Sequence, residues 1–293
     1  MRTIGWSPDG TKVAVGTVSF AEGVPGILAV WDFQTGDLET TTSCGDAIWS
    51  LDWAPDGTKI AMLCSLVGGS EFQSWSQVQD AATGDTLLTL SDSDPSALFN
   101  SVKWSPDGTY LLTTGGDDQT GPKNNPVIIW DANTGGKLLT INRHTGQVWW
   151  GSWSPDGRRI ATGSTDDTTR IWDAATGAEL LTLSTPSDWS VSPQWSPEGD
   201  LLAVGRYSFD SPSKTEVWRV WQSTEELIAY AKECCVFREL TPEERERFGL
   251  QPVAEQTPLT TPQASNGAAS LAVPIVFAAA GVGLLVKRLS VQR

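Results

Sequence analysis

Several residue types that carry enzyme and nucleic-acid chemistry are scarce in this chain of 293 residues. It has a single histidine, His144, and no Gly-x-Ser-x-Gly segment, so the residue sets of common hydrolases are missing. Its four cysteines show no Cys-x-x-Cys spacing, which gives no indication of a zinc site. The sequence therefore predicts no catalytic residues, no metal and no cofactor.

Basic residues are also scarce, because 20 Lys and Arg stand against 35 Asp and Glu, for a net charge of −15. A surface of this sign repels phosphate groups instead of neutralising them. The charge balance therefore argues against nucleic acid as a partner.

A pentapeptide of the form Trp-Ser/Ala-Pro-Asp/Glu-Gly is what the chain has in abundance. Its five copies begin at Trp6, Trp53, Trp104, Trp153 and Trp195. Intervals of about 40 to 50 residues are typical of radially repeated sheets and not of helical solenoids. In the fourth copy, segments rich in apolar and β-branched residues alternate with turn residues, which predicts strands over 148–153, 159–163, 168–172 and 180–183. The first three units match this pattern, so we expect each of the first four units to form one such four-stranded sheet.

Three units close their predicted third strand with a Trp-Asp pair, at Trp31-Asp32, Trp130-Asp131 and Trp172-Asp173. With these pairs and the five turns in phase, residues 1–222 resemble the WD-repeat β-propeller family. The resemblance implies an all-β propeller of WD-type four-stranded blades, near 1–43, 44–91, 92–142, 143–184 and 185–222. This family most often has seven blades, and no outer strand for the fifth unit is evident. We therefore expect an incomplete ring with further blades upstream.

In that family a His, a Ser or Thr, an Asp and the third-strand Trp form a buried hydrogen-bonded tetrad within a blade. Only the fourth unit offers all four, as His144, Thr162, Asp166 and Trp172. We interpret this set as structural, because its fourth member is an indole N–H donor and no nucleophile is placed beside it.

Three further tryptophans stand a few residues before a repeat tryptophan, where propellers of this family pass from an outer strand into the next blade. They are Trp49, Trp149 and Trp189. We predict that they bind a partner on the top face, because a rigid indole buries a large area at a small entropic cost. The alternative is that they line the central funnel.

Two cysteines fall in the second unit. Cys44 holds the position that His144 has in the fourth unit, and Cys64 lies near the end of the second predicted strand. One interpretation is a buried pair of free thiols. If the propeller is exported, a disulfide between the two becomes chemically allowed.

Beyond Trp221 the pattern changes from strands to helices, and we expect a helical tail over 223–250 that packs on the propeller, as in multidomain bacterial proteins. A linker rich in Pro, Thr and Gln follows over 251–267.

The C-terminal segment predicts a membrane anchor. Residues 268–286 are uncharged and long enough to cross a bilayer, which predicts a transmembrane helix. Residues 287–293 form a basic tail. Because the basic flank of a membrane span stays in the cytoplasm, we expect the propeller on the extracytoplasmic side. The alternative, if Met1 is the true start, is a tail-anchored protein with its propeller in the cytoplasm.

These features together predict a non-enzymatic scaffold for a protein or peptide partner, displayed at a bacterial membrane. One alternative is the C-terminal sensor propeller of a larger signalling enzyme, such as a kinase or an ATPase, with its N-terminal part missing. A propeller hydrolase has the least support, because no catalytic motif is present.

Overall fold

The computed structural model describes residues 3–19, 24–66, 73–90, 98–116, 125–184, 189–207, 214–221, 224–234 and 286–289. The chain divides into two compact units, Met1–Val220 with Arg288–Arg293, and Trp221–Lys287. In the second unit, helix α1 (Thr224–Cys234) carries Tyr230, whose ring centroid lies 5.2 Å from that of Trp221.

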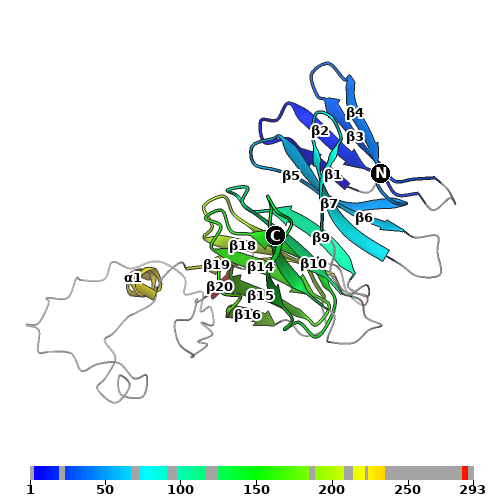
Figure 1. Ribbon diagram of the computed structural model, residues 1–293. Coiled ribbons are helices and arrows are strands. Elements are labelled where there is room, and N and C mark those ends of the chain that lie inside the picture. Colours follow the sequence, from blue (N-terminus) through cyan, green and yellow to red (C-terminus); the bar gives the residue numbers. More distant parts are fainter. Residues whose placement is uncertain are drawn as a thin grey trace, which may run out of the picture. The chain divides into compact units, whose positions relative to one another are not determined.

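The described residues of the first unit form antiparallel sheets of consecutive strands, numbered here in chain order (Figure 1). Sheet 1 contains β1 (Thr3–Trp6), β2 (Lys12–Gly16), β3 (Ile27–Asp32) and β4 (Leu38–Ser43). Sheet 2 contains β5 (Ala47–Trp53), β6 (Lys59–Leu66), β7 (Gln73–Asp80) and β8 (Thr86–Leu90). Sheet 3 contains β9 (Phe99–Trp104), β10 (Tyr110–Gly115), β11 (Val127–Asp131) and β12 (Lys137–Ile141). Sheet 4 contains β13 (Val148–Trp153), β14 (Arg159–Ser164), β15 (Thr168–Asp173) and β16 (Glu179–Ser184).

Sheet 5 contains β17 (Trp189–Trp195), β18 (Leu201–Tyr207), β19 (Lys214–Val220) and β20 (Val286–Leu289). The predicted all-β chain of four-stranded sheets is thereby confirmed. In the fourth unit the strands begin and end within one residue of the predicted bounds.

The repeated pentapeptide forms the first turn of each sheet through local hydrogen bonds. In sheet 3, Ser105 Oγ donates to the Asp107 carboxylate over 2.6 Å, and the backbone N–H of Thr109 donates to the same carboxylate over 3.0 Å. These bonds hold the pKa of Asp107 below its ordinary value of 3.8, and the bond from Ser105 has the largest effect. Gly108 follows with a φ of 72°, which only glycine adopts at little cost.

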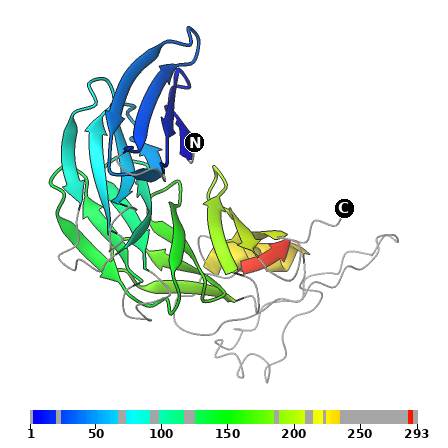
Figure 2. The same ribbon diagram turned by 90° about the vertical axis from the view of Figure 1, so that its right-hand side faces the viewer.

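Successive sheets pack face to face in chain order, from blue to yellow-green in Figure 2. At the three interfaces among sheets 1 to 4, the repeat tryptophans of one sheet share an apolar cluster with aliphatic side chains of the preceding sheet. In sheet 4, Trp153 and Trp172 pack with Ile129 and Leu112 of sheet 3. The apolar core therefore lies between the sheets, as layers of interdigitated side chains.

The outer strand of sheet 5 corrects the expectation that the fifth unit has none. Val286, Lys287 and Arg288 form part of β20, whereas the sequence pattern had assigned them to the end of a transmembrane helix and to a basic tail. The prediction failed here because strand pairing with a segment so distant in sequence leaves no local signal.

Other predicted C-terminal segments fall largely outside the described residues. These are residues 235–250 of the helical tail, the linker over 251–267 and residues 268–285 of the transmembrane helix. Within the part of the chain that the structure describes, no helix has the length and apolar character needed to span a bilayer.

Candidate partner-binding site

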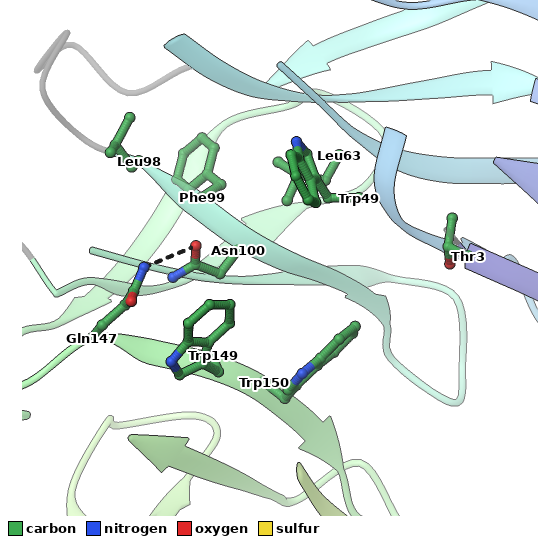
Figure 3. Close-up of a pocket in the computed structure, with 9 residues that line it drawn as sticks. All are labelled: Thr3, Trp49, Leu63, Leu98, Phe99, Asn100, Gln147, Trp149 and Trp150. Carbon is green, nitrogen blue, oxygen red and sulfur yellow. Dashed lines mark hydrogen bonds between the residues drawn. The ribbon is translucent and has the colours of Figure 1, made fainter. Parts of the chain in front are cut away.

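A pocket of about 450 Å³ opens where the first strands of sheets 1 to 4 begin (Figure 3). We call it the tryptophan pocket. Among the residues that the structure describes, its lining carries no charged side chain and consists of Thr3, Trp49, Leu63, Leu98, Phe99, Asn100, Gln147, Trp149 and Trp150. An aromatic and amide surface of this kind can hold an apolar or cationic group but offers no nucleophile or general base.

A repeated β-bulge directs side chains of three sheets into the tryptophan pocket. The register of the first two strands shifts at Trp49 in sheet 2, at Asn100 in sheet 3 and at Trp149 in sheet 4. Each of these residues is therefore an additional residue in the first strand, with no paired residue in the second strand. Successive side chains of a regular strand point to opposite faces, but a bulge changes their direction. It allows the consecutive residues Trp149 and Trp150 to line the same pocket.

Two amide side chains connect sheets 3 and 4 at the pocket wall. Asn100 Nδ2 donates to the backbone oxygen of Val148 over 3.0 Å. Gln147 Nε2 donates to the backbone oxygen of Gly116 over 2.9 Å and to Asn100 Oδ1 over 3.4 Å, the bond drawn in Figure 3. The N–H groups of both amides are thereby committed to the protein, which limits their reorientation toward a ligand.

The predicted tryptophans have different surroundings. Trp49 and Trp149 both line the tryptophan pocket, and Trp49 Nε1 donates to Ser65 Oγ over 2.6 Å. Trp189 does not line it, and its ring centroid lies 6.1 Å from that of Tyr207. Because the pocket lies along the first strands, binding a partner and lining a central space are compatible roles for Trp49 and Trp149.

Sequence reasoning missed Asn100, Gln147, Phe99 and Trp150 as pocket residues. A signal for Asn100 was available, since it holds in the third repeat the position that Trp49 and Trp149 hold in the second and fourth. The prediction rested on tryptophans at that position and so did not include the amide. Trp150 had no such signal, because it reaches the pocket only through the bulge beside it.

The tetrad residues form one continuous hydrogen-bond chain in sheet 4. His144 Nδ1 lies 2.9 Å from Asp166 Oδ2, and His144 Nε2 lies 2.8 Å from Thr162 Oγ1. Trp172 Nε1 donates to the same Thr162 oxygen over 2.8 Å. His144, Thr162 and Trp172 are buried, and the chain ends on an indole, so this arrangement holds the loop before β13 to β14 and β15.

Several neighbours act on the carboxylate of Asp166. Burial raises the pKa of Asp166, but the hydrogen bond and electrostatic attraction from His144 outweigh burial and hold the pKa far below the ordinary value of 3.8. The backbone N–H of Thr145 also donates to the carboxylate over 3.0 Å. Asp166 is therefore ionised throughout the neutral range and is no proton donor.

Cys44 and Cys64 are joined by a disulfide, with their Cα atoms 5.6 Å apart. Both are buried in the core between sheets 1 and 2, where Trp75 packs beside them. The free-thiol interpretation therefore does not describe this structure. The disulfide ties the loop before β5 to β6, at the place where the tetrad ties sheet 4.

Comparisons with known proteins bear on the fold. A family model described as "WD domain, G-beta repeat" matches residues 84–120 and 135–173. A solved structure described as "Crystal Structure of Mitotic Checkpoint Complex" is similar with a TM-score of 0.58 and 22% identity, over 74% of this chain and 60% of that chain. This chain thus spans about 60% of the length of that structure. No curated protein matches. WD40 repeats are therefore found in two places, and the sheets match a WD40 propeller.

Proposed function

We propose that this protein is a non-enzymatic interaction scaffold whose tryptophan pocket receives a segment of a protein partner. The observation that carries the proposal is the first-strand bulge that recurs in sheets 2 to 5 and, in sheets 2 to 4, brings Trp49, Asn100 and Trp149 to one pocket. Each bulge interrupts the hydrogen-bond ladder, and bulges often redirect a side chain toward a functional site.

The composition of the pocket favours a peptide or protein as the ligand. Indole rings combine a large apolar surface with few rotatable bonds, so tryptophan is enriched among the residues that dominate protein interfaces. The WD40 propeller fold is suited to protein–protein interaction, in agreement with this choice. The wall amides of Asn100 and Gln147 are already held by the backbone, which limits the entropic cost of ordering them on binding.

We further propose that the scaffold lies in an oxidising, extracytoplasmic compartment. The support is the disulfide between Cys44 and Cys64, because cytosolic reductants keep most thiols reduced. The membrane span predicted over 268–286 is not part of this proposal, since β20 places Val286–Leu289 in sheet 5, and a chain that crossed a bilayer just before β20 could not return to that sheet. Alkylation of the protein in intact cells should leave Cys44 and Cys64 unmodified until a reductant is added; modification without reductant would favour the cytoplasm.

A peptide-library selection on the purified full-length chain tests the binding function. Selected peptides should lose at least about tenfold in affinity for Trp149→Ala, because truncation of a central interface indole costs about 2 kcal/mol. The matched control is Trp6→Ala, which removes the same side chain type from sheet 1, outside the pocket. Peptides whose affinity is indifferent to Trp149→Ala would place the binding surface elsewhere.

A further inference from the structure

We propose that sheet 1 binds sheet 5 of a second copy of this chain, through faces of the two sheets that are left partly exposed in the single molecule. The contact repeats between two molecules the packing that joins consecutive sheets within one. The tryptophan pocket takes no part in it, so this association and the proposed binding function can fail independently.

Sheet 1 is apolar on both faces. Ala14 and Val30 are paired across β2 and β3 and lie in the core toward sheet 2. Trp6, Val13 and Trp31, which are also paired across the strands, point to the opposite face. An antiparallel sheet with one face in water normally carries polar residues on that face. Sheet 1 instead has the residue pattern of a sheet that is covered on both sides.

The exposed face of sheet 1 corresponds in sequence to covered faces of later sheets. Ile4 stands two residues before its repeat tryptophan, as Leu51 and Val102 do in sheets 2 and 3. The side chain of Ile4 is 55% exposed, whereas Leu51 and Val102 are buried. Trp6 is likewise half exposed, and its counterpart Trp53 is buried. Sheet 1 therefore presents the tryptophan half of a sheet–sheet interface.

Sheet 5 presents the aliphatic half of the same interface. In sheets 1 to 4, the face toward the next sheet has a buried aliphatic pair at its centre, namely Ala14 with Val30, Ala61 with Val78, Leu112 with Ile129, and Ala161 with Ile171. The corresponding pair in sheet 5 is Ala203 with Val217, and both residues are only half-buried. This pair points away from sheet 4, because Trp195 on the opposite face of sheet 5 lies against Arg159 of sheet 4.

The two halves do not pack on each other within one molecule. Consecutive sheets are in extensive contact, but among the strands that the structure describes, those of sheet 1 have at most marginal contact with those of sheet 5. A second copy brings an aliphatic face of the type that the repeat tryptophans already cover elsewhere in the chain. Because the two faces differ, the contact is head-to-tail, and it can extend to further copies or close into a ring.

Sedimentation velocity of the full-length chain, from about 1 to about 100 μM, tests the association. The average mass should rise with concentration, and single chains should dominate below about 1 μM. The net charge of −15 makes the copies repel one another, so added salt should strengthen an apolar contact by screening that repulsion. The mass of a single chain at every concentration and salt would overturn the proposal.

Charged variants locate the contact. Ile4→Glu on sheet 1 and Val217→Glu on sheet 5 should each weaken association by at least about tenfold, because either change buries an unpaired carboxylate in the interface. The matched control is Leu138→Glu, which adds the same charge at a side chain that is also 55% exposed but belongs to the outer strand of sheet 3. Association that persists in both folded test variants, or that is lost equally in the control, would overturn the proposed contact.

A mixture of the two test variants examines the head-to-tail geometry. Ile4→Glu keeps the face of sheet 5 intact, and Val217→Glu keeps the face of sheet 1 intact. The equimolar mixture should therefore form complexes of two chains, although neither variant associates alone. A mixture that stays monomeric would show that the two faces do not bind each other. Circular dichroism identifies a variant that fails to fold, and the native concentration series with the remaining variant then decides the question.

Discussion

Sheets 1 and 4 carry the same pair of repeat tryptophans, but the pair is exposed in sheet 1 and buried in sheet 4. Trp6 and Trp31 are 51% and 39% exposed, whereas Trp153 and Trp172 are 8% and 0% exposed. In sheet 4 the pair packs on aliphatic residues of sheet 3. In sheet 1, Trp6 instead meets Phe33, which is itself 62% exposed, with ring centroids 4.5 Å apart.

This difference shows that the repeat motif does not by itself produce burial. Both sheets have the same turns and the same antiparallel register at the tryptophans, because Trp6 pairs with Val13 as Trp153 pairs with Ile160. The neighbouring sheet supplies the second half of each apolar interface. An identical residue therefore contributes very different amounts to stability in the two sheets.

The largest expected effect comes from removing one tryptophan of each pair. Trp172→Ala should lower the free energy of unfolding by about 3–5 kcal/mol, because it leaves a large cavity and removes the indole N–H that donates to the Thr162 hydroxyl. Trp31→Ala should change it by less than about 1 kcal/mol, since that side chain is already partly in water. Urea denaturation of both variants measures the two values, and equal losses would remove the basis of the comparison.

A second experiment compares the disulfide of sheet 2 with the hydrogen-bonded tetrad of sheet 4. Replacing Cys44 and Cys64 together by alanine should lower stability by about 2–4 kcal/mol, since the disulfide restricts the unfolded chain. Reductant should lower the melting temperature of the native protein and leave that of the double variant unchanged. A native melting temperature that reductant does not move would contradict a stabilising disulfide.

The hydrogen-bonded tetrad should contribute less to the free energy of unfolding than the disulfide does. His144→Ala should cost about 1–3 kcal/mol, because it removes the imidazole that bonds both to the buried carboxylate of Asp166 and to the hydroxyl of Thr162. Peptide binding at the tryptophan pocket should persist, as His144 is not among its lining residues. Loss of binding with an unchanged melting temperature would make His144 a functional residue and not a structural one.

The smallest expected effect is on the loss of stability at acidic pH. The pKa of Asp166 is lower in the folded chain than in the unfolded one, so the unfolded state takes up a proton first as the pH falls. The stabilisation is therefore complete above the ordinary pKa of about 4 and is lost as the pH falls below it. Melting temperatures between pH 6 and pH 2 should decline less steeply in Asp166→Asn than in the native protein; parallel declines would show that other carboxylates dominate acid unfolding.

Much of the fold could be predicted from the sequence because its turns are local. Ser105, Asp107 and Gly108 complete the turn of sheet 3 within a few residues, so a short motif identifies it. The candidate site was predicted only in part. Trp49 and Trp149 were named from their repeat position, whereas Trp150 reaches the pocket through a bulge that no residue type announces.

By itself, the sequence determined the strands, the turns and the alternation of apolar residues, because proline, glycine and aspartate act on the backbone nearest to them. Only the tertiary structure decided three other properties: which tryptophans are buried, which first-strand residues share a pocket, and that β20 completes sheet 5. Each depends on a surface contributed by residues distant in the chain. A local sequence pattern does not identify that packing surface. The favourable free energy of burial arises only when the surface covers the residue.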